Sequence, residues 1–400
     1  MSSQALIFIP GITGTKLVNT NLVSFDTVWS GVQKEFESIE QLELTRQESG
    51  HFYEEEPTSI IEAGEVEWLA YGEVVRYLRR KTPVFIFNYD WRMSAVENGA
   101  RLEEFVEYLT AKSRASVEMG TIRKFDFVTH SLGNFILRNY IHRCGFGRIN
   151  RIVFTVPPFL GSLDIVSVVL AGEGLFHGTK EKTRKITRTF PGALELLPSY
   201  EEAGRFTTGA DREVRFFNPD HWQKNITRTT GVTTAKSRLA AKFKKVLVLA
   251  GETANNEIVD LAALDAGEKR RILVIARTGY KTLQSIEVVR RMQGEPGNYY
   301  DLRGAHKTDD GDGAVPHVSS CHYCREPKGV QTLMVTNDWM YKEHKHAFIL
   351  NDERSQRLIK RFLFDETFDM HSPGRSIRRV VDLEPIDPDG RPSWKAVYEE

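Results

Sequence analysis

A serine lies between a short apolar run and a helical segment near the middle of the N-terminal half. The run spans residues 125–128 and the helical segment spans residues 134–142. The turn between them reads Thr129-His130-Ser131-Leu132-Gly133. A strand, a serine turn and a helix in this order are typical of a nucleophile elbow, G-x-S-x-G, where small residues let strand and helix approach closely. Thr129 replaces the first glycine, so an ordinary serine near a helix start is the alternative.

An acidic loop and two histidines follow this serine in the order that a catalytic triad on such a sheet requires. The loop spans residues 309–316, and His344 and His346 come after an apolar run at residues 330–335. Each group lies in a loop or at the end of a predicted strand, where catalytic side chains of a parallel sheet belong. These residues by themselves leave open which aspartate and which histidine take part.

The first apolar run, residues 5–9, leads into the turn Pro10-Gly11-Ile12-Thr13-Gly14-Thr15. A buried strand that ends in a glycine-containing turn can offer backbone N–H groups to a developing oxyanion. A plain tight turn is the alternative, and it would be preferred if the serine and the histidines were absent.

Composition excludes several classes of protein. The chain has 400 residues, of which 54 are basic and 54 acidic, and this balance gives no support to a nucleic-acid partner. The N-terminal apolar run is too short for a signal peptide, and no stretch of 18 apolar residues predicts a transmembrane helix. Only three cysteines occur, which argues against a disulfide framework, and we therefore expect a cytoplasmic location.

Cys321 and Cys324 form a C-x-x-C pair with His317 nearby. A structural zinc site needs four ligands, and the sequence has no second pair of this kind. The motif also does not open a helix in a thioredoxin-like unit. We expect two reduced thiols in a loop, no metal and no cofactor.

Apolar runs alternate with helical patterns along most of the chain. The predicted strands are residues 5–9, 84–88, 125–128, 151–155, 246–250 and 330–335, with a further short strand, expected at an edge, at residues 273–276. Their continuous Val, Ile, Phe and Leu content fits strands that helices cover on both faces. Helical periodicity is found at residues 71–80, 102–111 and 355–364. This alternation predicts an α/β fold with a doubly wound, mostly parallel sheet.

Two stretches interrupt the alternation. Residues 17–65 are acidic and weakly periodic and indicate an insertion after the first strand. The expected units are a discontinuous core of residues 1–160 and 245–365, a cap or lid of residues 161–244, and a C-terminal tail of residues 366–400. Within the cap, the apolar run 165–170 favours a buried helix, and an acyl-chain wall or membrane-facing patch is the alternative. The tail is expected to wrap the surface or to be partly disordered.

Taken together, the motifs resemble the lecithin:cholesterol acyltransferase family, which also holds lysosomal phospholipase A2 and the phospholipid:diacylglycerol acyltransferases. The resemblance covers residues 5–363 as separated motifs in one order. The matching segments are residues 9–17, 88–92, 130–134, 157–162, 190–191 with 196–199, and 310–315. The most specific of them is Tyr-Asp-Trp-Arg at positions 89–92. The resemblance implies an α/β-hydrolase fold with a cap insertion.

The resemblance also implies roles for individual residues. Ser131 would be the nucleophile, Asp312 the acid and His346 the base, with His344 as a fallback that fits the family's spacing less well. Leu132 and Ile12 would supply the two oxyanion N–H groups. The residues expected to shape the site are Gly11, Thr129, Gly133, Tyr89, Asp90, Trp91 and Arg92.

Two features near these residues have more than one interpretation. The Asp90, Trp91 and Arg92 cluster either binds substrate or forms a buried ion pair that braces the oxyanion turn, and bracing is favoured because buried charges are usually paired. His130, next to the nucleophile, is interpreted as structural.

The function implied is a serine-dependent lipid acyl hydrolase or O-acyltransferase that works through an acyl-enzyme. The alternatives are a non-lipid esterase, thioesterase or peptidase on the same fold, and a catalytically silent binding protein. The expected partner is a lipid or other acyl ester, transient contact of the cap with a membrane surface is an option, and the oligomeric state is left open.

Overall fold

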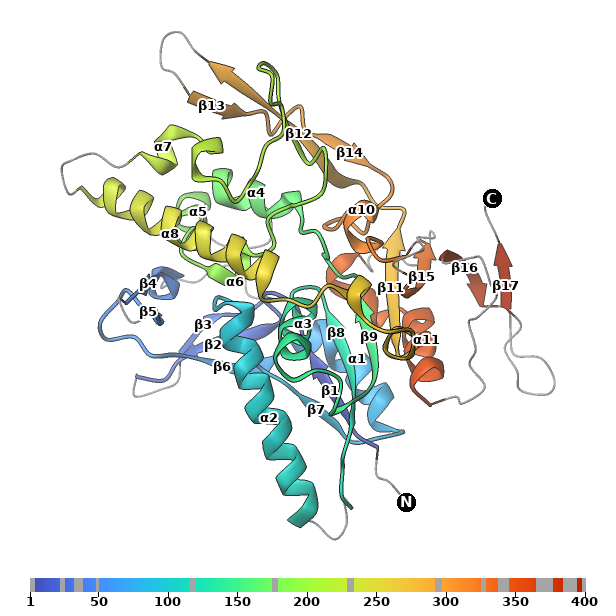
Figure 1. The fold of residues 1–400 in the computed structure, drawn as a ribbon. Coiled ribbons are helices and arrows are strands. Elements are labelled where there is room, and N and C mark those ends of the chain that lie inside the picture. Colours follow the sequence, from blue (N-terminus) through green and yellow to red (C-terminus); the bar gives the residue numbers. More distant parts are fainter. Residues whose placement is uncertain are drawn as a thin grey trace.

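The structure is a computed structural model. It describes residues 4–21, 26–31, 39–47, 50–115, 120–174, 179–228, 234–291, 297–324, 329–336 and 345–364, together with the backbone of two C-terminal strands. A twisted sheet runs through the lower half of the molecule, and a layer of helices with a long hairpin covers it from above (Figure 1).

The central sheet has eight strands in the order β17-β16-β15-β11-β9-β8-β1-β7. The strands are β1 (Leu6–Ile9), β7 (Val84–Ile86), β8 (Phe125–His130), β9 (Ile149–Thr155), β11 (Ile272–Thr278), β15 (Gln331–Thr336), β16 (Ile377–Leu383) and β17 (Trp394–Val397). All neighbours pair in parallel except β16 and β17. The inner strands β8 and β11 are buried along their full length, as their continuous apolar sequences require.

Helices cover the sheet on both faces. α1 (Trp68–Arg79) and α11 (Glu353–Phe364) pack on one face, against side chains such as Phe8 and Val128. α2 (Ala95–Ala115) and α3 (Gly133–Cys144) pack on the other face, against Ile9 and Phe127. Because adjacent residues of each strand point to opposite faces, the two cores share the same strands. This arrangement confirms the doubly wound, mostly parallel α/β sheet of the α/β-hydrolase fold.

The segment between β1 and α1 forms small sheets of its own. β2 (Thr15–Asn19) pairs with both β3 (Asp26–Trp29) and β6 (Ile61–Val66), and β4 (Leu44–Arg46) pairs with β5 (Phe52–Glu54). The 3-10 helix η1 (Ile39–Leu42) lies between β3 and β4.

The upper layer contains several short helices and a long helix. Its elements are α4 (Leu163–Ala171), α5 (Lys180–Thr187), α6 (Pro191–Leu194), β10 (Gly204–Phe206), η2 (Pro219–His221), α7 (Lys224–Thr227) and α8 (Ala235–Asn256). β10 joins a second sheet with β12 (Thr282–Arg291), β13 (Gly297–Tyr300) and β14 (His306–Thr308). The division into core, cap and tail remains a prediction. The second sheet crosses the predicted boundary at residue 245, because β10 comes from the predicted cap and β12, β13 and β14 from the predicted core.

Elements that are mostly short link α8 to α11. They are η3 (Leu261–Ala263), α9 (Ala266–Lys269), β11, the strands β12, β13 and β14, α10 (His317–Ser320), β15 and η5 (His346–Asn351).

Residues 246–250 belong to α8, so the strand predicted there is wrong. Phe243, Val246, Leu247 and Ala250 are buried at a spacing of three and four residues, which is one face of a helix. A short apolar run does not distinguish this face from a strand. Residues 273–276 lie in β11 between β9 and β15, so the prediction of an edge strand is also wrong.

Two further segments can be compared with their predictions. Residues 165–170 lie in α4, whose Ile165, Val166, Val168 and Val169 are buried, so the prediction of a buried helix is confirmed and that of a membrane-facing patch is wrong. The C-terminal segment, expected to wrap the surface or to be partly disordered, contributes strands β16 and β17. A strand at a sheet edge needs only backbone pairing, which apolar periodicity does not reveal.

Candidate active site

Ser131 lies on the turn between β8 and α3. Its φ is +48°, a left-handed conformation that non-glycine residues seldom adopt and that clusters at functional sites. A Cβ atom on Gly133 would come within 2.7 Å of the carbonyl oxygens of Ile9 and Pro10, so the start of α3 touches the end of the neighbouring strand β1 at this glycine. The close approach explains why the second glycine of the elbow is retained.

Thr129 takes the place of the first elbow glycine without leaving a polar group unpaired. Its hydroxyl donates to Asn134 Oδ1 at 2.8 Å, and Asn134 Nδ2 donates to the Ser131 carbonyl. The Thr155 hydroxyl donates to the Thr129 carbonyl at 2.6 Å. The threonine therefore ties the elbow to the first turn of α3 and to β9.

The serine, histidine and aspartate expected to form a triad are brought together. His346 Nε2 lies 2.8 Å from Ser131 Oγ, and His346 Nδ1 lies 2.7 Å from Asp312 Oδ2. The second oxygen of Asp312 accepts from the backbone N–H groups of Ala314 and Val315. His344, the fallback histidine, lies outside the described residues.

Opposing effects act on the pKa of His346. Burial disfavours its charged form, but the charge of Asp312 and the hydrogen bond to it favour that form, and the net result is a raised pKa. Burial raises the pKa of Asp164, at the start of α4, to about 7, although the charge of His346 opposes this rise. Asp164 is a carboxyl group within electrostatic reach of the site that the sequence does not single out.

A buried ion cluster anchors the segment that carries His346. Asp352 follows η5 directly and accepts from Arg277 Nη1 at 2.8 Å and from Arg354 Nη2 at 2.8 Å. Burial opposes ionisation of Asp352, but Arg354 and Arg277 lower the pKa of its carboxyl. Arg277 lies in β11, so the cluster joins the sheet to the histidine segment. No local sequence signal links Arg277 to Asp352, because their contact spans 75 positions.

The turn after β1 presents backbone groups to the nucleophile. Ile12 and Leu132 are buried, and within the described part of the chain neither of their N–H groups donates to a protein acceptor. Thr13 has a φ of +60°, which is strained for a β-branched residue, and the Gly14 N–H closes the turn on the Gly11 carbonyl. Buried unpaired donors are uncommon and suit an oxyanion site.

Side chains from residues 89–91 hold both ends of this turn. Tyr89 donates its hydroxyl to the Pro10 carbonyl at 2.8 Å, and Trp91 Nε1 donates to the Thr15 carbonyl at 3.0 Å. These contacts favour the bracing interpretation of the Tyr-Asp-Trp-Arg segment over direct substrate binding.

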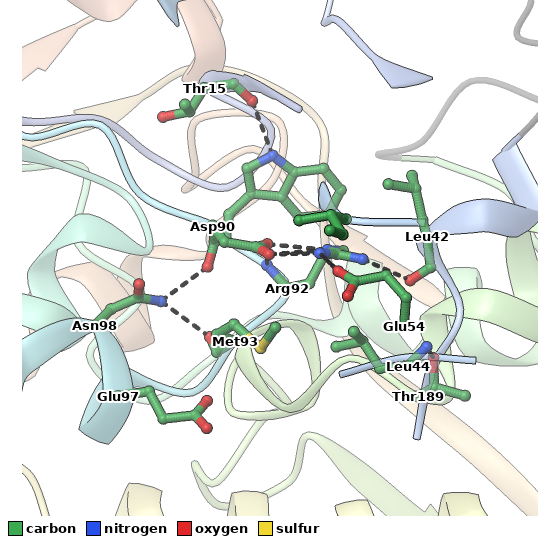
Figure 2. Close-up of polar contacts among 12 residues, drawn as sticks. Thr15, Leu42, Leu44, Glu54, Asp90, Arg92, Met93, Glu97, Asn98 and Thr189 are labelled. Carbon is green, nitrogen blue, oxygen red and sulfur yellow. Dashed lines mark hydrogen bonds and ion pairs between the residues drawn. The ribbon is translucent and has the colours of Figure 1, made fainter. Parts of the chain in front are cut away.

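The charged pair beside Trp91 is buried and well paired. Figure 2 shows Arg92 next to Asp90 and Glu54, with the Leu42 carbonyl at the far side of the guanidinium. Arg92 Nη2 lies 2.6 Å from Asp90 Oδ2 and 2.8 Å from Glu54 Oε1. Burial opposes the charge of Arg92, but Asp90 and Glu54 raise its pKa. Asn98 Nδ2 caps the Asp90 and Met93 carbonyls.

A cavity of about 100 Å³ opens next to the nucleophile. Ser131, His346, His130 and Tyr71 are among the residues that line it, together with Leu69 and Phe348. Leu69 is 61% exposed and Phe348 39% exposed, so apolar side chains form part of the mouth. Such a lining suits an apolar acyl chain more than a charged group.

Cys321 and Cys324 are buried, and none of the chain's three cysteines, all of which are described, forms a disulfide. Among the residues that the structure describes, no group of three His, Cys, Asp or Glu side chains is arranged to hold a metal ion. No helix in the described ranges is long and apolar enough to cross a membrane.

Comparison with one solved structure agrees with the fold. A chain in the crystal structure of the Tle4-Tli4 complex superposes with a TM-score of 0.61 at 14% identity, over 92% of this chain and 100% of that chain. The mature lipase BlEst2 of Bacillus licheniformis gives a TM-score of 0.37 at 10% identity, over 90% of this chain and 92% of that chain. No curated protein sequence matches this one. The sequence profile of the family described as lecithin:cholesterol acyltransferase matches residues 32–353.

Proposed function

Because the chain belongs to the lecithin:cholesterol acyltransferase family, we propose that it is a serine-dependent lipid acyl hydrolase or O-acyltransferase whose acyl-enzyme forms on Ser131. The family itself supports the coarser statement, an activity on lipid acyl groups. The observation that carries the finer proposal is the pair of contacts from His346, 2.8 Å to Ser131 Oγ and 2.7 Å to Asp312 Oδ2. A nucleophile, a base and a group that orients the base need this arrangement.

The acylation step follows from these contacts. Neutral His346 takes the proton of the Ser131 hydroxyl as its oxygen attacks the ester carbonyl, and Asp312 stabilises the imidazolium that forms. The oxyanion of the tetrahedral intermediate accepts from the N–H groups of Ile12 and Leu132, which are unpaired within the described residues. The imidazolium then returns its proton to the leaving alcohol as the ester C–O bond breaks, which leaves the acyl group on Ser131.

The acyl-enzyme is resolved by an oxygen nucleophile that His346 activates in the same way. Water gives a free acid, and an alcohol gives a new ester. We propose hydrolysis as the basal reaction, because water needs no binding pocket of its own.

We propose that a lipid surface delivers the substrate past the mouth of the cavity. Trp68 is 45% exposed at the start of α1 and directly precedes Leu69, which lines the cavity, so exposed apolar surface continues along α1 beyond the cavity lining. We propose that these exposed apolar side chains contact the lipid surface. Residues 165–170 are not proposed for this contact, because most of their apolar side chains are buried.

Trp68→Ser tests this route. We expect a lower rate on ester lipids in vesicles and an unchanged rate on a soluble short-chain ester, because Trp68 does not line the cavity. Val289→Ser is the matched control, since Val289 is 38% exposed on β12. Equal rates on vesicles for both variants would contradict the proposed route.

A fluorophosphonate probe tests the nucleophile. We expect the folded protein to be labelled and the Ser131→Ala variant to be unlabelled and inactive. Labelling that persists in Ser131→Ala would show that another serine reacts, and a folded protein that is never labelled would favour a silent binding protein. Rates on matched ester, thioester and amide substrates then separate the lipid proposal from a thioesterase or a peptidase.

We propose a cytoplasmic location on the basis of the three cysteines, none of which forms a disulfide. Fractionation of cells that express the full chain, followed by detection of the protein, tests this proposal.

A further inference from the structure

A chain of hydrogen bonds runs behind the nucleophile from the turn after β1 to the backbone of His346. The Gly11 N–H lies 3.1 Å from the Tyr71 hydroxyl oxygen, which lies 2.9 Å from His130 Nδ1. His130 Nε2 lies 2.9 Å from the backbone carbonyl oxygen of His346. The chain thus connects the oxyanion turn, α1, the elbow and the histidine segment, which are far apart in the sequence.

The chemistry of the partners fixes the direction of each bond. A carbonyl oxygen only accepts, so His130 Nε2 carries the proton and donates to His346. In a neutral imidazole the other nitrogen is then an acceptor, so the Tyr71 hydroxyl donates to His130 Nδ1 and accepts from Gly11. Burial, together with the nearby His346, lowers the pKa of His130 to about 3, which agrees with a neutral ring at every working pH.

We propose that His130, held by Tyr71, is a positioning residue that fixes the backbone of His346 for proton transfer. The proposal rests on the proposed function, because it concerns the base of that reaction. His346 is held on both sides of its main chain: its N–H donates to the Asp312 carbonyl at 3.0 Å, and its carbonyl accepts from His130. Because its backbone is fixed at both ends, the His346 imidazole stays within hydrogen-bond distance of both Ser131 and Asp312.

Tyr71 sets the tautomer that this role requires. If Tyr71 did not donate, the proton of His130 could move to Nδ1, and Nε2 would then face the His346 carbonyl with its lone pair. The imidazole of His130 also packs closely against the turn after β1, because a Cβ atom on Gly11 would lie 2.6 Å from His130 Nδ1. Tyr71 is 3% exposed and its ring meets that of His130 edge-on, with 5.5 Å between centroids. Both rings of the network are therefore almost fully buried and in contact with each other.

Two substitutions at His130 separate the two halves of the network. The side-chain amide of glutamine reaches about as far as Nε2, so His130→Gln retains a donor toward the His346 carbonyl. The amide of asparagine reaches only about as far as Nδ1, so His130→Asn retains the contact with Tyr71 and loses the contact with His346. Each variant loses one buried hydrogen bond, so both are expected to lose stability to a similar degree.

The experiment compares kcat and KM of both variants on a soluble ester and the rate of fluorophosphonate labelling as a function of pH. We expect His130→Asn to lower kcat about 10- to 100-fold with KM changed less than about 3-fold, because a misplaced base slows only the chemical step. We expect His130→Gln to keep kcat within about 3-fold of the wild type. In His130→Asn the acidic limb of the labelling profile should move to lower pH, since a displaced His346 loses its contact with Asp312.

Other outcomes separate the failure of this inference from the failure of the proposed function. Equal kcat values for His130→Asn and His130→Gln, with Ser131→Ala inactive, would overturn the positioning role alone. Full activity of Ser131→Ala would overturn the proposed function. If His130→Asn does not fold, Tyr71→Phe takes its place, and an unchanged kcat in folded Tyr71→Phe would equally overturn the role.

Discussion

The buried pair of Asp90 and Arg92 offers a direct test of whether this segment braces the fold or binds substrate. Asp90→Asn keeps the size of the side chain and removes its charge. Arg92 is fully buried and retains Glu54 as its remaining acidic partner. Removing one partner of a buried ion pair destabilises a protein by about 3–5 kcal/mol, and because the contact with Glu54 remains, the expected loss for Asp90→Asn is about 3 kcal/mol.

The matched control is an exposed pair of the same kind. Arg143 Nη2 lies 2.7 Å from Glu103 Oε2, and the two side chains are 39% and 41% exposed. Exposed pairs contribute about 0–1 kcal/mol, so Glu103→Gln should shift the denaturation midpoint little. The assay is guanidinium denaturation of the wild type and both variants, followed by far-UV circular dichroism.

Catalysis supplies the second readout. If the segment braces the oxyanion turn, Asp90→Asn lowers stability and kcat, and KM changes little. The bracing argument is refuted if Asp90→Asn is no less stable than Glu103→Gln, and a raised KM at unchanged stability would show that Asp90 contacts the substrate.

Three further predictions concern the site and its support. Asp312→Asn should lower kcat by about 10⁴ and move the acidic limb of the kcat/KM profile to lower pH, because the raised pKa of His346 depends on that carboxylate; an unmoved limb would contradict this. Glu195 accepts from the Ala95 N–H, and burial raises its pKa well above the usual value, so the folded state retains a proton that the unfolded state loses above about pH 4.5. The stability of the wild type should therefore fall with rising pH relative to Glu195→Gln, by up to about 1.4 kcal/mol per pH unit, as parallel denaturation series would measure. Gly133→Ala should abolish fluorophosphonate labelling, whereas Gly147→Ala, with nothing within 4 Å of the added Cβ, should label normally.

Local patterns in the sequence account for much of the fold. The strand, serine turn and helix around Ser131 are adjacent along the chain, so their residues reveal them directly. Helices α1, α2 and α11 each have an apolar stripe that falls within their observed bounds. The apolar run at residues 246–250 does not show whether it is a strand or part of α8. Five apolar residues fit a buried strand as well as one face of a long helix.

The candidate site was only partly accessible to such reasoning. The order of a serine, an acidic loop and two histidines along the chain indicates a triad, and the family resemblance implies that Asp312 and His346 take part. The distances between these groups depend on where the loops end. Tyr71 and Arg277 gave no signal, because each reaches its partner across 59 or more positions. Long-range polar contacts depend on the packing of whole elements, which single residues do not encode.

The first residues of the upper layer are tied to the loop that carries Asp312. The Ser162 hydroxyl donates to the Ala314 carbonyl at 2.6 Å, and the Ser319 hydroxyl donates to the Gly161 carbonyl at 2.8 Å. If the upper layer moved about a hinge at this junction to widen the cavity, the loop would move with it. The Asp312 carboxylate would then lose its contact with the His346 imidazole. With such a hinge, a bulky substrate could not enter while the triad is intact. Any opening motion that leaves the triad intact therefore has its hinge after Ser162 in the chain.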